Sequence, residues 1–106
     1  MGVKMINVST QFSRYPAGRY RTDGEFTGEV FREDFLIPAL NSNQKVEVLL
    51  DGGMGYGSSF LEEAFGGLVR VNHIQPAELR KKLFVISQED PSLVEEIWRY
   101  IDESDK

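Results

Sequence analysis

The sequence predicts a single α/β domain over residues 1–106, with helices packed on a small mixed sheet. Three observations lead to this expectation. Short apolar runs alternate with longer segments in which apolar residues recur at helical spacing. Turn-forming residues separate these segments. The chain of 106 residues, 41% of them hydrophobic, is also long enough to bury one core without cross-links.

The first half of the chain is expected to form a strand, a helix and a second strand. Val3 to Val8 is the first apolar run, and Phe12 to Tyr15 could continue it or pair with it. Thr27 suits the N-cap of a helix that should kink or stop near Pro38, because proline lacks a backbone donor. Val46 to Leu50 is nearly continuously apolar, which is typical of a strand covered on both faces.

The second half is expected to form two helices, a strand and a final helix. A helix should run from about Ser59 to Val69, with Gly66-Gly67 marking close packing of the helix on the sheet or a local break. Pro76 to Lys82 could form a short helix with proline at its first position. A strand over Leu83 to Ser87 follows, and the Asp90-Pro91 pair indicates the start of the last helix.

The composition excludes several kinds of site. The chain has no cysteine and one histidine, which rules out disulfides, thiolate catalysis, Cys-based zinc sites and His-pair metal sites. The net charge of −5 disfavours nonspecific binding to nucleic acid. No apolar run reaches the ~18 residues of a membrane span, and the N-terminus lacks a signal-peptide core. We therefore expect a cytoplasmic protein without membrane contact or cofactor.

A glycine-rich turn between Asp51 and Gly57 leads into Ser58 and Ser59 at the expected helix start. Backbone N–H groups and the helix dipole favour negative charge at such a position. A P-loop would require lysine where Ser58 stands, and a dinucleotide fingerprint would require glycine there. Ser59 is therefore either a helix cap, which with Glu62 would form a capping box, or a phosphate-accepting switch.

Catalytic residues are not predicted. Either serine would need a base within hydrogen-bond reach to act as a nucleophile, and His73, the one histidine, lies in a segment expected to be a loop. Carboxylates that are neighbours in the sequence do not face each other on a helix. The sequence thus indicates a protein that is not an enzyme.

Two arginines in a loop-like segment leave two interpretations open. Arg19 and Arg21 could hold a phosphate or carboxylate through paired hydrogen bonds. They could equally pair with Asp23, Glu25 and Glu29 in a local network. The first interpretation would make the chain a ligand-binding domain for an anionic metabolite or a nucleotide.

Two runs of the chain resemble a known family. They extend from Gly18 to Leu40 (GRYRTDGEFTGEVFREDFLIPAL) and from Asp51 to Leu68 (DGGMGYGSSFLEEAFGGL). From Phe12 to Ile86 the chain resembles the small bacterial STAS-like domains of unknown function (DUF4325), which are distantly similar to anti-sigma factor antagonists. The resemblance implies a single-domain STAS-like fold.

The resemblance also implies a switch. In anti-sigma factor antagonists, a partner kinase of the GHKL ATPase type phosphorylates a serine at the start of the corresponding helix, which maps onto Ser59, or second onto Ser58. On this interpretation, a protein partner would dock on the turn and helix from Tyr56 to Phe65. Antagonists usually carry Asp where Gly57 stands here and a small residue where Phe60 stands.

The function predicted from the sequence is a non-catalytic regulatory module that binds a protein partner and is switched by serine phosphorylation. The alternative is the ligand-binding domain for an anionic metabolite or nucleotide. Contacts to the partner or anion are expected from Arg19, Arg21, Asp23, Tyr56, Gly57 and Phe60.

Overall fold

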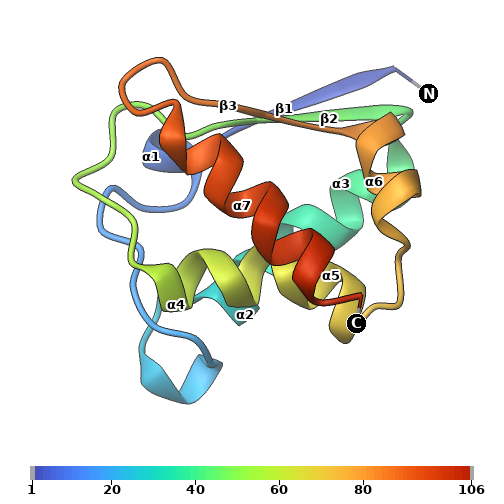
Figure 1. The fold of residues 1–106 in the computed structure, drawn as a ribbon. Helices are drawn as coiled ribbons and strands as arrows, with labels where there is room; N and C mark the ends of the chain where they lie inside the picture. The colour runs from blue at the N-terminus through green and yellow to red at the C-terminus, as the bar shows by residue number, and fades with distance from the viewer. Residues whose placement is uncertain (1, 106) are drawn as a thin grey trace.

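The computed structural model describes residues 2–105, in which three strands form one sheet with the order β1-β2-β3. The strands are β1 (Val3–Asn7), β2 (Lys45–Leu49) and β3 (Leu83–Ile86). Both strand pairs are parallel, with Ile6 opposite Val48 and Val48 opposite Val85. The α/β class is confirmed. The sheet is parallel rather than mixed, because helices between the strands return the chain to the same end of the sheet (Figure 1).

The helical segments form two long helices and several shorter pieces. In chain order the segments are α1 (Val8–Gln11), η1 (Arg21–Asp23), α2 (Gly28–Phe31), η2 (Arg32–Leu36), α3 (Ile37–Ser42), α4 (Ser58–Leu61), η3 (Glu62–Gly66), α5 (Gly67–Arg70), α6 (Pro76–Lys82) and α7 (Ser92–Glu103). Segments α2, η2 and α3 are continuous and are called the first long helix, residues 28–42. Segments α4, η3 and α5 are called the second long helix, residues 58–70. Both η2 and η3 are π-helical.

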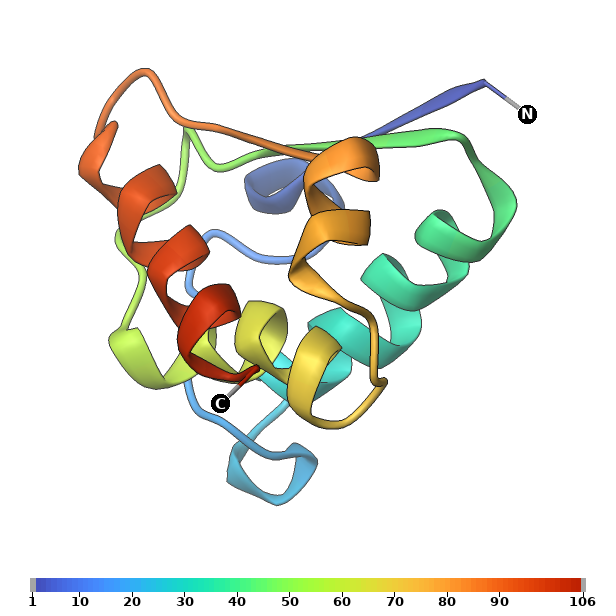
Figure 2. The same cartoon turned by 45° about the vertical axis from the view of Figure 1, so that its right-hand side comes forward.

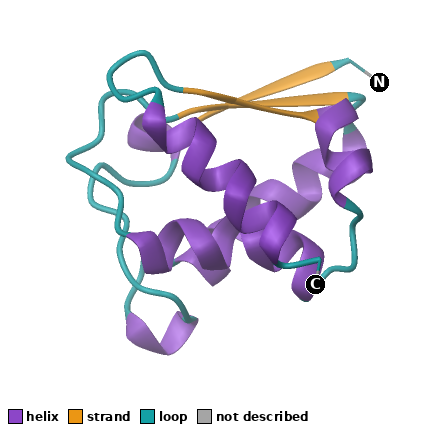
Figure 3. Cartoon of the chain, in the orientation of Figure 1, coloured by secondary structure: helices purple, strands orange, loops and turns teal. Residues whose placement is uncertain are grey.

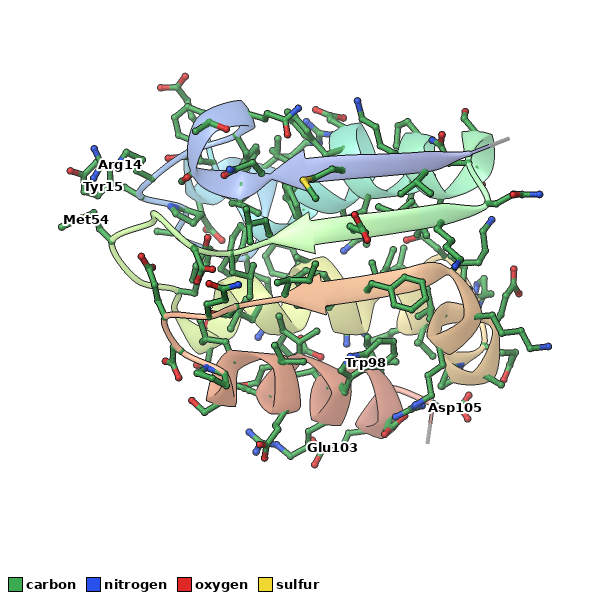
Figure 4. The ribbon with its side chains drawn as sticks, turned by 90° about the horizontal axis from the view of Figure 1, so that it is seen from above. Arg14, Tyr15, Met54, Trp98, Glu103 and Asp105 are labelled. Carbon is green, nitrogen blue, oxygen red and sulfur yellow. The ribbon has the colours of Figure 1, made fainter. Side chains whose placement is uncertain are left out.

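The long helices, α6 and α7 lie on one side of the sheet (Figures 2 and 3). The strand side chains that face them are buried, and include Ile6, Val46, Val48, Leu83 and Val85. The other face is open, as the view from above shows (Figure 4), and Met5 and Phe84 are exposed. The expectation that β2 is covered on both faces is therefore wrong, because every connection crosses the same side.

The first long helix begins as expected and ends later. Thr27 is its N-cap, and the Thr27 hydroxyl accepts a hydrogen bond from the Val30 N–H at 3.4 Å. The helix does not stop at Pro38 but continues to Ser42. In a regular helix Pro38 would bond to the carbonyl of Asp34, which lies inside the π-helical segment, where that regular pattern is already interrupted.

The second long helix is closely packed at Gly67, but against the first long helix and not on the sheet as expected. A Cβ atom added to Gly67 would lie 2.2 Å from Arg32 Nη1, and one added to Gly28 would lie 2.6 Å from the Phe60 carbonyl oxygen. The long helices therefore approach each other at positions that tolerate no side chain. Aromatic rings fill the space beside this contact, namely those of Phe12, Phe26, Phe31, Phe35, Tyr56, Phe60 and Phe65.

The remaining elements match the expectations with small shifts. Segment α6 has the predicted bounds, and α7 begins at Ser92, whose N–H donates to the Asp90 carboxylate at 3.2 Å. Phe12 to Tyr15 does not extend the first strand, because α1 follows β1 directly. Within the described residues, none of the helices has the length and apolar character needed to cross a membrane.

Candidate functional site

The two serines lie at the exposed start of the second long helix. Gly57 is the N-cap residue, with φ −72° and ψ 151°, so Ser58 and Ser59 occupy the first two helical positions. Neither hydroxyl caps the helix. The expected capping box of Ser59 with Glu62 is therefore wrong. The helix begins one residue earlier than expected, and the Glu62 carboxylate pairs instead with Arg19 and Arg70.

The serines are exposed at a helix start that the following residues hold against the core. Ser58 and Ser59 are both solvent-exposed, whereas the next two residues, Phe60 and Leu61, are 1% and 0% exposed. The Phe60 ring lies 6.0 Å from Phe31, measured between centroids, inside the aromatic cluster. Phe60 therefore fixes the helix to the core and presents no ring surface to a partner.

Asp51 fixes the start of the glycine-rich turn to the segment that follows β3. Its carboxylate accepts hydrogen bonds from the N–H groups of Gln88 at 3.0 Å and Glu89 at 2.9 Å, and from the Ser87 hydroxyl at 3.2 Å. The hydrogen bonds from the Gln88 and Glu89 backbone favour the ionised form and lower the pKa of Asp51. Gly52 N–H completes the connection by donating to the Glu89 carboxylate at 3.0 Å.

The lowered pKa of Asp51 predicts a pH-dependent stability. A carboxyl whose folded pKa is depressed stabilises the fold above its unfolded pKa, and this contribution is lost as the pH falls through the folded pKa. The melting temperature of Asp51→Asn should lie below that of the wild type near pH 7, and the two should converge below about pH 4. Thermal denaturation across this range measures the effect. A constant difference at every pH would contradict it.

Tyr56 anchors the other end of the turn. Its hydroxyl donates to the Leu50 carbonyl oxygen at 2.8 Å, and its ring is half-buried against Phe60. Burial, together with the nearby charges of Asp51 and Glu89, raises the pKa of Tyr56 to about 12. The phenol is thus a neutral hydrogen-bond donor that holds the turn in place.

A small cavity beside the turn is poorly suited to an anion. It has a volume of about 180 Å³, below the ~300 Å³ of the smallest usual ligand pockets. It is lined by Leu50, Gly53, Gly55, Tyr56, Ser87, Glu89, Asp90 and Leu93. The charged groups in this lining are carboxylates, which repel phosphate and carboxylate ligands.

Arg19 belongs to a cluster of charges where the two long helices meet. This ion cluster consists of Arg19, Arg32, Arg70, Glu62 and Glu63. Arg32 donates to the Glu63 carboxylate at 2.6 Å, and their side chains are 1% and 3% exposed. Arg19 contacts both glutamates from the outside, as does Arg70. Burial disfavours the Glu62 carboxylate, but hydrogen bonds from Arg70 and Arg19 outweigh it and lower the pKa of Glu62.

Arg21 is also paired with carboxylates. Its guanidinium contacts Glu33 at 3.1 Å and Asp34 at 2.8 Å, both on the first long helix. Of the partners considered from the sequence, Glu29 accepts the Arg21 backbone N–H, and Asp23 accepts the backbone N–H groups of Arg19 and Tyr20. The two guanidinium groups thus pair mainly with helix residues distant in the sequence, and are not brought together around an open anion site.

Sequence reasoning missed a group of exposed side chains at the loop tips. The Met54 N–H donates to the Arg14 carbonyl oxygen at 2.9 Å and joins the glycine-rich turn to the loop after α1. Arg14, Tyr15 and Met54 lie together at this end of the molecule (Figure 4), and Tyr15 and Met54 are 68% and 63% exposed. No local pattern could have revealed the group, because its members come from two distant loops. We call Arg14, Tyr15 and Met54 the loop-tip patch.

The geometry defines a small α/β domain that exposes a serine pair beside a glycine-rich turn held by hydrogen bonds to neighbouring segments. Across residues 2–105, no group of three or more His, Cys, Asp or Glu side chains is placed to hold a metal ion. The chain belongs to the family described as STAS-like domain of unknown function (DUF4325), whose family model matches residues 27–93. No curated protein and no solved structure was found to match the chain.

Proposed function

We propose that this chain is a non-catalytic regulatory module that binds a protein partner, and that Ser59 is its phosphorylation switch. Ser58 is the second candidate. The modifying enzyme would be a kinase of the GHKL type that is also the partner. One observation carries this proposal: both hydroxyls are exposed at a helix start and have no capping role.

The position of Ser59 suits a switch that works by charge. A phosphate group adds about 1.5–2 negative charges at pH 7. The N-terminal end of the helix dipole would stabilise that charge, so modification need not unfold the helix. Phe60 and Leu61 hold the helix in the core. Phosphorylation would therefore alter the surface presented to the partner while leaving the fold intact.

The surface around the serines supports docking of a protein. The loop-tip patch contains arginine, tyrosine and methionine, residue types that are enriched at protein interfaces. It is joined to the glycine-rich turn that leads directly into Ser58. By contrast, Arg19 and Arg21 are occupied by carboxylates, and the cavity at the turn carries acidic groups. The binding of an anionic metabolite or nucleotide is therefore the less supported alternative.

Phosphorylation is tested by incubating the protein with ATP and a GHKL-type kinase from the native host. Mass spectrometry should find phosphate on Ser59, and the modification should be lost in Ser59→Ala and retained in Ser58→Ala. Two unmodified serines in the wild type would reject the switch.

Binding is tested separately by capturing partners from the native host with wild type and Ser59→Glu. The GHKL-type kinase should be captured by one form at least several times more strongly than by the other. Ser92→Glu is a matched control, because Ser92 is exposed at the start of α7 and its substitution should leave capture unchanged. Equal capture by all three proteins would count against the proposal.

A further inference from the structure

The outer edge of β3 offers backbone groups without a partner strand. β3 is the last strand of the sheet and pairs with β2 alone. The Leu50 N–H donates to the Ile86 carbonyl oxygen, so Ile86 directs its backbone toward β2. Neighbouring residues of a strand point their backbone groups in opposite directions. The N–H and C=O of Val85 therefore face outward, and no strand within residues 2–105 pairs with them.

The two edges of the sheet differ in how they are protected. The edge strand β1 contains the charged residue Lys4, and its Asn7 N–H donates to the Gln11 side chain at 2.5 Å. Charged residues and side-chain caps are devices that keep edge strands from pairing with other chains. The four residues of β3, Leu83 to Ile86, are all apolar and carry no such device.

A groove runs along this unprotected edge. It has a volume of about 660 Å³ and is lined by Glu47, Arg80, Leu83, Phe84, Val85, Ile86 and Trp98. Seen from above the sheet, α7 lies beyond β3, and Trp98 lies between them (Figure 4). Arg80 lies at the end of the groove where β3 begins. Its guanidinium carbon stacks 4.8 Å from the centroid of the Trp98 ring, and its two terminal nitrogens each donate to the Asp102 carboxylate at 2.8 Å. The helical layer thus extends beyond the edge of the sheet, and the groove has a mixed lining of apolar side chains with Glu47 and Arg80.

We propose that this groove binds an extended peptide segment of a partner protein, which adds to the edge of β3 as a fourth strand. The inference is independent of the serine switch and concerns a different surface. Main-chain hydrogen bonds to Val85 would supply affinity, and alternate side chains would contact Trp98. A second copy of this chain fits poorly, because its own α7 would occupy the same space beneath the joined edges.

The charges at the two ends of the groove define the chemistry of the peptide. The start of β3 follows the basic end of α6, where Lys81 is exposed and Arg80 is already paired with Asp102. The end of β3 leads to Glu89 and Asp90, both exposed. The complementary peptide has acidic residues where it lies beside α6, basic residues at its other end, and β-branched residues between them.

The test uses a synthetic peptide with this pattern, acetyl-Asp-Asp-Thr-Val-Thr-Val-Thr-Lys-Lys-amide, and the full chain. Trp98 is the single tryptophan, so its fluorescence reports on the groove. Titration should give a saturable change in emission, and hydrogen exchange at the Val85 amide should slow on binding. A peptide in which both aspartates and both lysines are replaced by serine should bind about tenfold more weakly. The absence of a saturable change with the first peptide would overturn the proposal.

Backbone pairing is tested with two further peptides, N-methylated on alternate residues. Only the peptide that keeps the N–H groups facing β3 should bind, and equal binding of both would overturn strand addition. As a protein variant, Trp98→Ala, measured by calorimetry, should weaken binding by about tenfold. Met5→Ala, on the exposed surface of the opposite edge strand, should leave it unchanged. The methylated peptides use the wild-type chain, so they decide the outcome even if Trp98→Ala does not fold.

Discussion

Replacing Glu63 with alanine should lower the free energy of unfolding by about 3–5 kcal/mol. The Glu63 carboxylate is 3% exposed and accepts a hydrogen bond from Arg32 at 2.6 Å. Arg32 also donates to the Glu63 carbonyl oxygen at 2.8 Å, a contact that alanine would retain. The variant would thus leave a guanidinium that is 1% exposed without its nearest counter-charge, and the remaining carboxylate, that of Glu33, lies 3.6 Å away and is largely solvated. Urea denaturation of wild type and variant measures the loss.

Two further variants distinguish the cost of an unpaired buried charge from the cost of losing an exposed ion pair. Arg32→Met combined with Glu63→Leu should be less destabilised than Glu63→Ala, because removing both charges leaves neither uncompensated. Arg21→Ala removes exposed ion pairs to Glu33 and Asp34 and should cost about 0–1 kcal/mol. Similar losses in Glu63→Ala and Arg21→Ala would show that burial of the ion cluster is not decisive.

Replacing Gly28 with alanine should destabilise the fold by about 1–3 kcal/mol, the usual cost of inserting an atom into a packed interior. The added Cβ would lie 2.6 Å from the Phe60 carbonyl oxygen and 2.9 Å from Glu63 Cβ. These atoms belong to the backbone and a buried side chain, so the helices must separate to accept it. Thermal or urea denaturation measures the loss.

Gly57 provides the matched control for Gly28. Its φ of −72° is open to any residue, and an added Cβ would meet no atom within 4 Å. Gly57→Ser should therefore change the free energy of unfolding by only a few tenths of a kcal/mol, about the difference between glycine and serine at an N-cap. Equal destabilisation by both substitutions would contradict the close approach of the long helices.

The ion cluster also connects the candidate switch to the rest of the molecule. Glu62 and Glu63 lie one turn after the serines on the same helix, and Arg19 reaches both from the loop before the first long helix. Each π-helical segment supplies one member of the buried Arg32–Glu63 pair. The irregular turns thus coincide with the point at which the long helices are joined.

Local patterns in the sequence predicted most of the elements. Apolar runs located the strands, and Thr27 marked the start of the first long helix. Gly66-Gly67 indicated close packing, which the structure shows at Gly67 against the first long helix in place of the sheet. The serine pair at a helix start was also visible, because the glycine-rich turn before it has a strong local signature. These features depend on residues that are neighbours in the chain.

The sequence by itself therefore determined the α/β class, the positions of the strands and of the main helix starts, and the serine pair at a helix start. Only the tertiary structure decided that Glu62 pairs with Arg19 and Arg70 and forms no capping box with Ser59. The tertiary structure also decided that the first long helix continues past Pro38, and that one face and one edge of the sheet stay open. The physical reason is distance along the chain. Arg19 and Glu62 become neighbours only when the long helices pack, and that contact outweighs the local preference for a capping box.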